Sequence, residues 1–437
     1  MSEENIILGA GVTGLAAGVV SGWPIYEAEE NPGGICSSYY MRPGDPRRYH
    51  DPPEDGEAYR FEIGGGHWIH SRDPMVLQFM QSMIKLKMYN RISAVYFPDK
   101  NVFIPYPIQN NLFYLGSKLA AKALKEMIEG HICKAPVETL ADWLLSTFGP
   151  TLCDLFFYPF HELYTGGLFK SIAPQDSYKS PVNLPMAIQG AFEETSPLGY
   201  NVIFYYPLNG LNALSKRMAA ASKVHYGKRV VEINVQSKEL IFEDGSTIRY
   251  SKVISTLPLK RVIELSNINI PSKPDPYTST LVLNIAAYKG RACPKEHWLY
   301  IPRSKAGFHR VGLYSNVDSS FLPASVDKDN DLVSIYVEKA YQENYKPTIS
   351  DICTYTDNVV KELMEWEWIK QTEIIDHTWI EISYCWSWPG STWKQEAITT
   401  LREHNIFQVG RFARWENQGI SDSITEGLIA GGALRKR

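Results

Sequence analysis

The sequence opens with Ile6-Ile7-Leu8-Gly9-Ala10-Gly11-Val12-Thr13-Gly14-Leu15, an apolar run that passes through glycines into a second apolar run. This order predicts a buried strand, a tight turn and the start of a helix. Gly9 allows the turn, Gly11 lets the backbone approach a pyrophosphate, and Gly14 lets the helix pack closely on the strand. The unpaired N–H groups at the start of the helix then face the phosphates.

An acidic residue follows at the spacing that such a motif requires. Glu27 ends a second short strand, Pro24-Ile25-Tyr26-Glu27, eighteen residues after Gly9. A carboxylate at this point accepts hydrogen bonds from ribose hydroxyls. Strand, helix and acid together predict dinucleotide binding, against the alternative of a glycine-rich turn in some other α/β protein.

The composition restricts the class of protein and its partners. At 437 residues the chain is long for one core, which predicts two or three packed units. The net charge of −4 gives no electrostatic basis for binding nucleic acid or an anionic membrane. No apolar stretch is long enough to span a bilayer. The acidic start, Met1-Ser2-Glu3-Glu4, is unlike a usual signal peptide.

The cysteines point to a compartment rather than to a site. None forms a C-x-x-C pair, so the sequence predicts neither a metal site nor a redox dithiol. We expect buried thiols in a reducing compartment, with the cytoplasm as the default. The cysteines are Cys36, Cys133, Cys153, Cys293, Cys353 and Cys385.

Changes of pattern along the chain predict its organisation. Helical apolar spacing from Ser117 to Met127 contrasts with strand-like runs such as Val253–Leu257 and Ile406–Val409. A helix is expected to start at Ser421 with that serine as its cap. The fold class is therefore α/β, with a Rossmann-type nucleotide-binding domain, a helical insertion and a second, mostly antiparallel sheet. The expected parts are the nucleotide-binding domain in three pieces (1–100, 201–265 and 396–437), a mostly helical part (101–200) and a β-sheet substrate domain (266–395).

A dinucleotide motif at one end and a strand, glycine and helix at the other is the layout of FAD proteins of the glutathione-reductase type. Within them, the sequence resembles the group that contains amine oxidases, protoporphyrinogen oxidase and UDP-galactopyranose mutase. Pro32-Gly33-Gly34-Ile35-Cys36-Ser37-Ser38 resembles the second glycine motif of this group. The resemblance implies that Gly33, Gly34 and Ser37 contact FAD.

Phe61-Glu62-Ile63-Gly64-Gly65-Gly66-His67-Trp68-Ile69-His70 is similar to the loop of the mutases that lies against the flavin ring. Glycines permit close approach of backbone to the ring system. The resemblance implies that Gly65, Gly66 and His67 contact the flavin, and it makes His67 a catalytic candidate that adjusts or contacts N5.

Two further segments resemble the substrate contacts of the mutases. Ile104-Pro105-Tyr106-Pro107-Ile108-Gln109-Asn110-Asn111 is similar to a segment of the eukaryotic-type enzymes in which a tyrosine and a glutamine hold uracil. It implies substrate contacts from Tyr106, Gln109 and Asn110. His309-Arg310-Val311-Gly312-Leu313-Tyr314-Ser315-Asn316 resembles the strand whose arginine grips the diphosphate, which a bidentate guanidinium suits.

The same resemblance extends to the C-terminal part of the chain. Tyr384-Cys385-Trp386-Ser387-Trp388-Pro389 corresponds to a segment that touches the diphosphate, which implies a substrate contact from Tyr384. Gly410-Arg411-Phe412-Ala413-Arg414-Trp415 resembles the last flavin motif of the mutases. The remaining cofactor contacts that the resemblance implies are Val230, Gly410, Arg411, Asp422 and Ser423.

The resemblance implies a nucleotide-sugar mutase that interconverts pyranose and furanose rings. In that chemistry N5 of reduced FAD is the nucleophile at the anomeric carbon, and no net redox change occurs. NAD(P)H is a possible reductant, and it would bind transiently because the sequence contains no second dinucleotide motif. The substrate is then a nucleoside-diphosphate sugar.

Two alternatives stay open at this stage. One is an FAD-dependent oxidoreductase of the amine oxidase or protoporphyrinogen oxidase type, and the other is a flavin-binding protein without catalysis. Arg310 and the uracil-like segment favour the mutase, because an amine or apolar substrate needs neither. The sequence departs from the mutases on the sugar side: Trp386 replaces an expected tyrosine, Glu416–Ser423 is shorter, and Pro159–Gly167 reads differently. It therefore identifies neither the sugar nor the oligomeric state.

Overall fold

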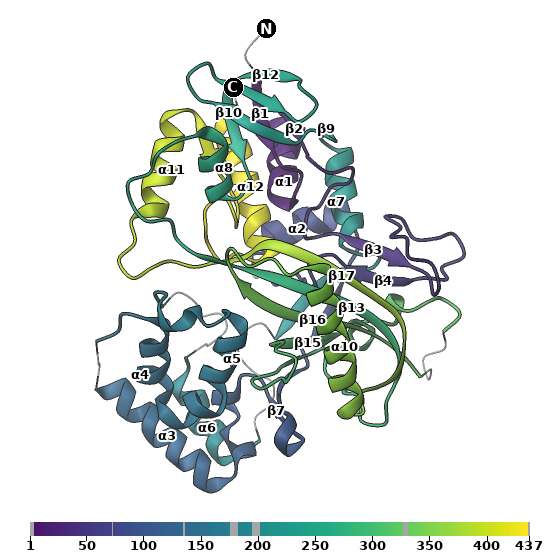
Figure 1. Cartoon of the computed structure of the whole chain (residues 1–437), viewed down its shortest axis with the longest axis vertical. Helices are drawn as coiled ribbons and strands as arrows, with labels where there is room; N and C mark the ends of the chain where they lie inside the picture. The colour runs from purple at the N-terminus through teal and green to yellow at the C-terminus, as the bar shows by residue number, and fades with distance from the viewer. Residues whose placement is uncertain are drawn as a thin grey trace.

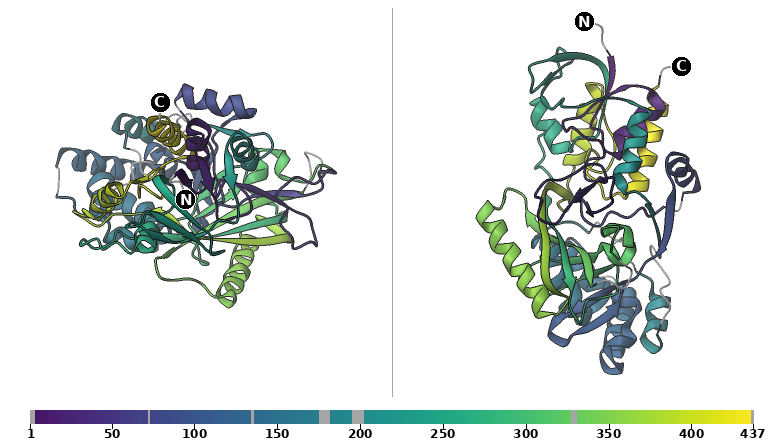
Figure 2. Two further views of the ribbon diagram at one scale, coloured as in Figure 1. Left: turned by 90° about the horizontal axis from the view of Figure 1, so that it is seen from above. Right: turned by 90° about the vertical axis from the view of Figure 1, so that its right-hand side faces the viewer.

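In the computed structural model, the chain is described for residues 4–71, 73–133, 136–174, 182–194, 202–326 and 331–435. Figure 1 shows a first sheet with its helices at the top, a second sheet at the centre and a group of helices at the lower left. Both chain ends lie beside the first sheet, as the two views of Figure 2 also show.

The first sheet is assembled from distant segments of the chain. Its order is β10-β11-β12-β1-β2-β9, with β18 beside β12. The pairs among β9, β2, β1, β12 and β18 are parallel, and β10 and β11 extend the sheet in antiparallel fashion. The bounds are β1 Glu4–Leu8, β2 Pro24–Tyr26, β9 Lys223–His225, β10 Val230–Asn234, β11 Glu239–Phe242, β12 Thr247–Ser255 and β18 Ile406–Gln408.

Helices cover both faces of this sheet, which explains the continuous apolar run in β1. Ile7 belongs to the same apolar cluster as Leu15 of α1. Ile6 and Leu8 point the other way and cluster with residues of α8 and α11. On the first side α1 packs against α12 and α7. The bounds are α1 Val12–Ser21, α7 Leu211–Ala220, α8 Leu259–Ser266, α11 Trp393–Glu403 and α12 Ile420–Leu434.

The second sheet has the order β17-β13-β16-β15-β14-β6-β7. Its pairs are antiparallel except for β14 with β6, which confirms the expected mostly antiparallel sheet. One face of this sheet packs on α10. The opposite face of β13 belongs to the apolar cluster that also includes residues of the first sheet. The bounds are β6 Ser93–Phe97, β7 Val102–Pro105, β13 Tyr277–Lys289, β14 Trp298–Tyr300, β15 Arg310–Leu313, β16 Leu332–Gln342, β17 Ile369–Cys385 and α10 Ile349–Glu365.

The expected helical part is present. A capping box of Thr139 and Asp142 starts α4. The chain then passes through a π-helical turn, η4, into α5. The bounds are η2 Ile108–Asn110, η3 Leu112–Leu115, α3 Ser117–Ile132, α4 Leu140–Leu152, η4 Cys153–Phe157, α5 Tyr158–Tyr164, η5 Leu168–Lys170 and α6 Leu184–Phe192.

Short elements join these parts. The β3–β4 and β5–β8 pairs are both antiparallel. The bounds are β3 Ser38–Met41, β4 Tyr59–Glu62, α2 Pro74–Met83, β5 Leu86–Asn90, η1 Pro98–Lys100, β8 Ile203–Pro207, α9 Tyr314–Val317 and η6 Ser319–Phe321. The expected part boundary at residue 100 falls between β6 and β7, which are paired strands of the second sheet. The boundary at residues 200 and 201 lies outside the described residues.

Two expectations about local structure are wrong. The last helix begins at Ile420 with Gly419 as its N-cap, not at Ser421, because the Asp422 carboxylate reaches back to the Gly419 N–H at 2.9 Å. The cysteines are not uniformly buried: Cys133 and Cys353 are exposed. Both lie on or beside surface helices, where a small side chain can face water. Among the helices in the described ranges, none has the length and apolar character needed to cross a membrane.

Candidate active site

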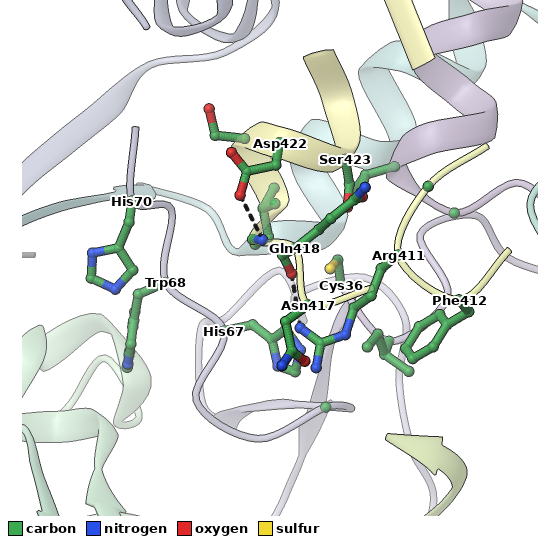
Figure 3. A pocket seen from close by; sticks show the side chains of 18 of the residues that line it. Cys36, His67, Trp68, His70, Arg411, Phe412, Asn417, Gln418, Asp422 and Ser423 are labelled. Carbon is green, nitrogen blue, oxygen red and sulfur yellow. Dashed lines mark hydrogen bonds between the residues drawn. The ribbon is translucent and has the colours of Figure 1, made fainter. Parts of the chain in front are cut away.

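A cavity of about 1040 Å³ is lined by loops of the first sheet, strands of the second sheet and the start of α12. This volume lies at the upper limit of the roughly 300–1,000 Å³ that is typical of ligand pockets. Figure 3 shows the side chains of one region of the lining, drawn from segments that are far apart in the sequence. The cavity therefore has room for more than one small ligand group.

The dinucleotide loop forms one end of the cavity. Gly11 lines it, and a Cβ at Gly11 would meet nothing within 4 Å, so this backbone faces open space. Gly9 and Gly14 act behind the lining. A Cβ at Gly9 would lie 2.4 Å from Thr256 Oγ1, and one at Gly14 would lie 2.0 Å from the Gly9 carbonyl oxygen. The structure thus requires glycine at both positions for packing.

Glu27 stands behind this loop rather than in the lining. Its carboxylate accepts hydrogen bonds from the Ala10 N–H at 2.5 Å and from the Glu29 N–H at 3.0 Å. Burial raises the pKa of Glu27, although these hydrogen bonds oppose the rise. The carboxylate holds the turn, and it is placed beside the loop where a ribose would follow a bound phosphate.

The second glycine motif meets the first directly. The Gly33 N–H donates to the Ala10 carbonyl at 2.8 Å, and Gly33 and Gly34 both line the cavity. Gly33 has a φ of +112°, which favours glycine. Ser37 is buried outside the lining, where its carbonyl accepts the Ile63 N–H at 2.9 Å. It supports the next loop through the backbone.

The loop Gly64–His67 forms the floor of the cavity. Gly64, Gly66 and His67 belong to the lining, whereas Gly65 lies beneath them with a φ of +75°. Burial lowers the pKa of His67 to about 4, and the nearby positive charges of Arg411 and Arg310 add to this effect. His67 is therefore neutral at pH 7.

The C-terminal motif also lines the cavity. Gly410 has a φ of +92° and packs on Thr13, so the C-terminal motif meets the dinucleotide loop directly. Arg411 donates to the carbonyl oxygens of Gln418 at 2.8 Å and Ser383 at 2.9 Å. These contacts hold the Arg411 side chain across the cavity wall. Gly410, Arg411, Asp422 and Ser423 all belong to the lining.

Several polar atoms of the lining are oriented for a ligand. Among the residues that the structure describes, His67 Nδ1, Arg411 Nε and Asn417 Nδ2 are buried and have no hydrogen-bond partner. Figure 3 shows these three side chains at the same part of the cavity. The free N–H groups at the starts of α1 and α12 lie along the same wall. Two helix N-termini suit phosphates, and buried donors suit a polar ring system, so the residues present fit a flavin dinucleotide.

The other end of the cavity contains an ion pair. The Arg310 guanidinium donates two hydrogen bonds to the Glu338 carboxylate, one of them from Nε at 2.9 Å. Both side chains line the cavity and both are largely buried. Burial would raise the pKa of Glu338, but Arg310 and His309 outweigh it and lower the pKa to about 2. No hydrogen bond of Arg310 Nη1 to the described residues is present, so this nitrogen is available to a ligand.

Aromatic side chains surround this ion pair. Tyr384 lines the cavity and makes an edge contact with Tyr164, whose ring centroid lies 4.8 Å away. Tyr106 packs on Tyr300 with a centroid distance of 4.3 Å. Trp386, the residue that departs from the mutase pattern, is fully buried behind Tyr384 and is outside the lining.

Besides Gly9, Gly14, Glu27, Ser37 and Gly65, described above, three further expected contacts lie outside the cavity lining. Gln109 and Asn110 are buried in η2, which is covered by α6. Val230 starts β10 at the edge of the first sheet, where it pairs with Phe242. The spacing within a proline-containing loop did not indicate which side chains of η2 turn inwards, because the covering helix α6 begins 74 residues after Asn110.

Sequence reasoning missed several residues of the lining. Glu338 is the most informative of them, because in β16 it is the first charged residue after the mostly apolar run Leu332–Val337, and that break in the pattern was a usable signal. Trp298, Tyr300, Asn417 and Gln418 gave no comparable signal. Within the described ranges, no cluster of three or more His, Cys, Asp or Glu side chains is placed to hold a metal ion.

The cavity fits a flavin dinucleotide, and the sequence comparison agrees with a flavin-dependent class of enzyme. A sequence model described as flavin containing amine oxidoreductase matches residues 24–413. The chain belongs to this family.

Among solved structures, the chain is similar to a reduced UDP-galactopyranose mutase, with a TM-score of 0.83 and 22% identity over 99% of this chain and 95% of that one. It is also similar to cyclohexylamine oxidase from Brevibacterium oxydans, with a TM-score of 0.62 and 12% identity over 100% and 99% of the two chains. A fatty acid isomerase from P. acnes that produces CLA gives 0.60 and 14% over 99% of both chains. At these identities the likeness is one of fold.

Proposed function

We propose that the protein is a nucleotide-sugar mutase that interconverts pyranose and furanose forms of its substrate on a reduced flavin. One observation carries the proposal. Arg310, whose side chain is largely buried, lines the same cavity as the Gly64–His67 loop and the N-termini of α1 and α12. A cation in the same cavity as the flavin-binding groups suits a substrate with a phosphate group, which an amine or an apolar substrate lacks. The similarity in fold to a UDP-galactopyranose mutase agrees with it.

The residues divide the work between binding and charge stabilisation. Arg310 neutralises the diphosphate as it leaves the sugar and as it returns. The bound flavin in its reduced form supplies the nucleophile at N5 for the anomeric carbon. Neutral His67 and the backbone of Gly66 hold the ring system, and Tyr384 borders the diphosphate. The protein thus contributes position and electrostatics to chemistry without net redox change.

The base of the nucleotide is held by aromatic packing in this proposal. Tyr106 lines the cavity at the end that is lined also by Tyr300 and Trp298, which provides a surface on which a flat base can stack. We assign base binding to Tyr106, while buried Gln109 and Asn110 maintain η2 beneath it. NAD(P)H is the proposed reductant, and it would use the same open cavity.

One observation favours a second candidate, an amine-oxidising flavoenzyme. Glu338 places a carboxylate in the lining and offsets the charge of Arg310, so this part of the cavity has no net positive charge that would repel an amine cation. The family and the oxidase structures of similar fold agree with this candidate. It predicts hydride transfer from an amine to the oxidised flavin.

The two candidates differ in the redox state that turns over. The test is to incubate oxidised and chemically reduced holoenzyme without oxygen with UDP-galactopyranose, other UDP-sugars, and dTDP- and GDP-sugars, and to separate the products by anion-exchange chromatography. The proposal predicts a furanose product only with reduced enzyme and no consumption of reductant. Flavin bleaching by an amine, with no furanose from any sugar nucleotide, would establish the oxidoreductase instead.

A further inference from the structure

Glu338 of the Arg310 end of the cavity also lies against the loop Gly64–His67. It lies on β16 directly opposite Arg310 of β15, and the two residues are register partners in the sheet. Its side chain is 3% exposed. One carboxylate oxygen accepts from Arg310 Nε at 2.9 Å, and the same oxygen lies 3.6 Å from His309 Nε2. Arg310 and His309, at the substrate end of the cavity, therefore hold the carboxylate in place.

The same carboxylate supports the flavin loop from below. A Cβ built on Gly65 would lie 2.7 Å from Glu338 Oε1, the oxygen that also accepts from Arg310 Nη2. Two residues earlier on the same face of β16, the Tyr336 ring fills the space under Gly66, where a Cβ would lie 2.0 Å from the hydroxyl. Gly65 and Gly66 thus rest on Glu338 and Tyr336, with no side chain between them and β16.

Charge links the two contacts. Glu338 and Arg310 act on the neighbouring His67 in opposite directions, the carboxylate favouring and the guanidinium opposing a proton there. An anion that binds Arg310 Nη1 shares the guanidinium with Glu338. Any change in this ion pair therefore changes the field at the loop that holds the flavin, at close range and in a buried site.

We propose that Glu338 is a positioning residue that couples anion binding at Arg310 to the redox state of the flavin. The inference rests on the proposed function for its anion and on the flavin fit of the cavity for its cofactor. Because coupling is reciprocal, an anion that shifts the reduction potential must bind oxidised and reduced protein with different affinities. The physical basis of this link is that one carboxylate, that of Glu338, contacts both the Arg310 guanidinium and the loop that would hold the flavin.

The experiment measures the dissociation constant of inorganic pyrophosphate for oxidised and for reduced holoenzyme by titration of the flavin absorbance. For the wild-type protein we expect the two constants to differ by about tenfold, within the usual range of coupling between sites. Saturating pyrophosphate must then shift the two-electron midpoint potential by about 30 mV, since this is the equivalent of a tenfold ratio. The two measurements check one another.

Glu338→Gln keeps the shape of the side chain and removes its charge. We expect the ratio of the two constants to fall to about twofold or less, because the carboxylate no longer links the sites. Without pyrophosphate, the potential of this variant rises relative to wild type, since a negative charge near the flavin is lost. Glu338→Asp keeps the charge but withdraws it from Gly65, and a ratio of about threefold is expected. If Glu338→Gln does not fold, the ratio of the two dissociation constants in Glu338→Asp tests the proposal instead.

Glu362→Gln is the matched control. Glu362 is also 3% exposed and fully hydrogen-bonded, to Ser304, Lys305 and Ala306, but it lies on α10 outside the cavity lining. It should retain the wild-type ratio. A wild-type ratio of one, an unchanged ratio in both Glu338 variants, or an equal loss in Glu362→Gln would each overturn the proposal.

The sugar-nucleotide assay separates this inference from the proposed function. A wild-type ratio that Glu338→Gln abolishes, together with no furanose product from any sugar nucleotide, supports the coupling and removes the mutase. Furanose formation by wild type, together with an unchanged ratio in the Glu338 variants, supports the mutase and removes the coupling.

Discussion

The two ends of the cavity are built from different kinds of atoms. At the end formed by the glycine motifs, the binding groups are backbone N–H donors at the starts of α1 and α12, and the surface is made by residues such as Gly11 and Gly34 that lack a side chain. At the other end the binding groups are side chains, above all Arg310, Glu338 and Tyr106. The first end depends on where the backbone runs, and the second depends on which side chains neighbour one another.

The two ends also treat charge differently. The N-terminus of α1 offers partial positive charge and has no acidic residue in its first turn, so a phosphate can bind there without displacing a carboxylate. Arg310 is already paired with Glu338 through Nε and Nη2, so an anion that binds Nη1 shares the guanidinium with that carboxylate. This difference predicts that changes at the first end alter cofactor retention, while changes at the second alter turnover and affinity with the cofactor still bound.

The largest effect is expected from Arg310→Ala. Turnover of the sugar nucleotide should fall about 100-fold or more, the typical cost of losing a group that stabilises charge in the transition state. The flavin should stay bound, as judged by its absorbance after gel filtration. Arg249→Ala, which breaks an exposed ion pair on β12, is the control and should turn over normally.

Arg310→Ala also leaves the Glu338 carboxylate buried without its counter-ion, which destabilises a protein by about 3–5 kcal/mol. The double variant Arg310→Ala/Glu338→Ala should recover most of this stability in thermal unfolding and none of the turnover. Recovery of turnover in the double variant would show that Arg310 has no role beyond neutralising Glu338.

Gly14→Ala tests the backbone-built end. The new Cβ would lie 2.0 Å from the Gly9 carbonyl oxygen, so the turn must shift. Overpacking of this kind costs about 1–3 kcal/mol, and we expect flavin content to fall about tenfold. Gly432→Ala is the control because its Cβ would meet only Val20, at 3.7 Å. Full flavin content in Gly14→Ala would contradict the close packing of α1 on β1.

Tyr106 and Gln109 divide a segment that the sequence treats as one unit. Tyr106→Ala should weaken UDP binding by about tenfold, the scale of one lost stacking contact of about 1–3 kcal/mol. Gln109→Ala should leave UDP binding unchanged within about twofold and lower the melting temperature instead, because it removes a buried polar side chain. UDP affinity is measured by calorimetry. Equal losses of affinity in both variants would show that Gln109 also contacts the base.

Glu62 gives the most pH-dependent effect. Burial raises its pKa to about 7, although the Tyr206 and Ser38 hydroxyls and Arg60 lower it. A carboxyl group whose pKa is higher in the folded state stabilises the fold below its ordinary pKa and loses this contribution as the pH rises through about 7. Glu62→Gln avoids that loss, so we expect it to gain on wild type by about 1–3 kcal/mol between pH 4.5 and pH 8. Thermal unfolding at both pH values checks the sign, and a larger gain at pH 4.5 would contradict it.

How much the sequence could predict follows from the same comparison. The turn at Gly9–Gly14, the parallel strands β1 and β2 and the helical insertion are local consequences of glycine placement and apolar spacing, so they were predictable. The start of α12 was misplaced by a short distance because a serine and a glycine can both precede a helix, and only the Asp422 side chain decides between them.

The substrate end was less predictable because its contacts are made between distant strands. Arg310 was identified from a resemblance. Its pairing with Glu338 depends on the register of β15 and β16, which cannot be predicted from the sequence alone. Gln109 illustrates the same limit, since its burial depends on α6. The resemblance predicted which residues lie at this end, but their contacts with one another are determined by the pairing of the strands.

The most direct test of the account is to trap the sugar on the flavin. Dithionite-reduced protein is incubated with a panel of UDP-, dTDP- and GDP-sugars and cyanoborohydride, and the mass of the released flavin is measured. The account predicts a flavin that is heavier by one sugar, for one class of sugar nucleotide, with Arg310→Ala giving none. Unmodified flavin across the whole panel, from protein that retains its flavin, would contradict the mutase and favour hydride transfer.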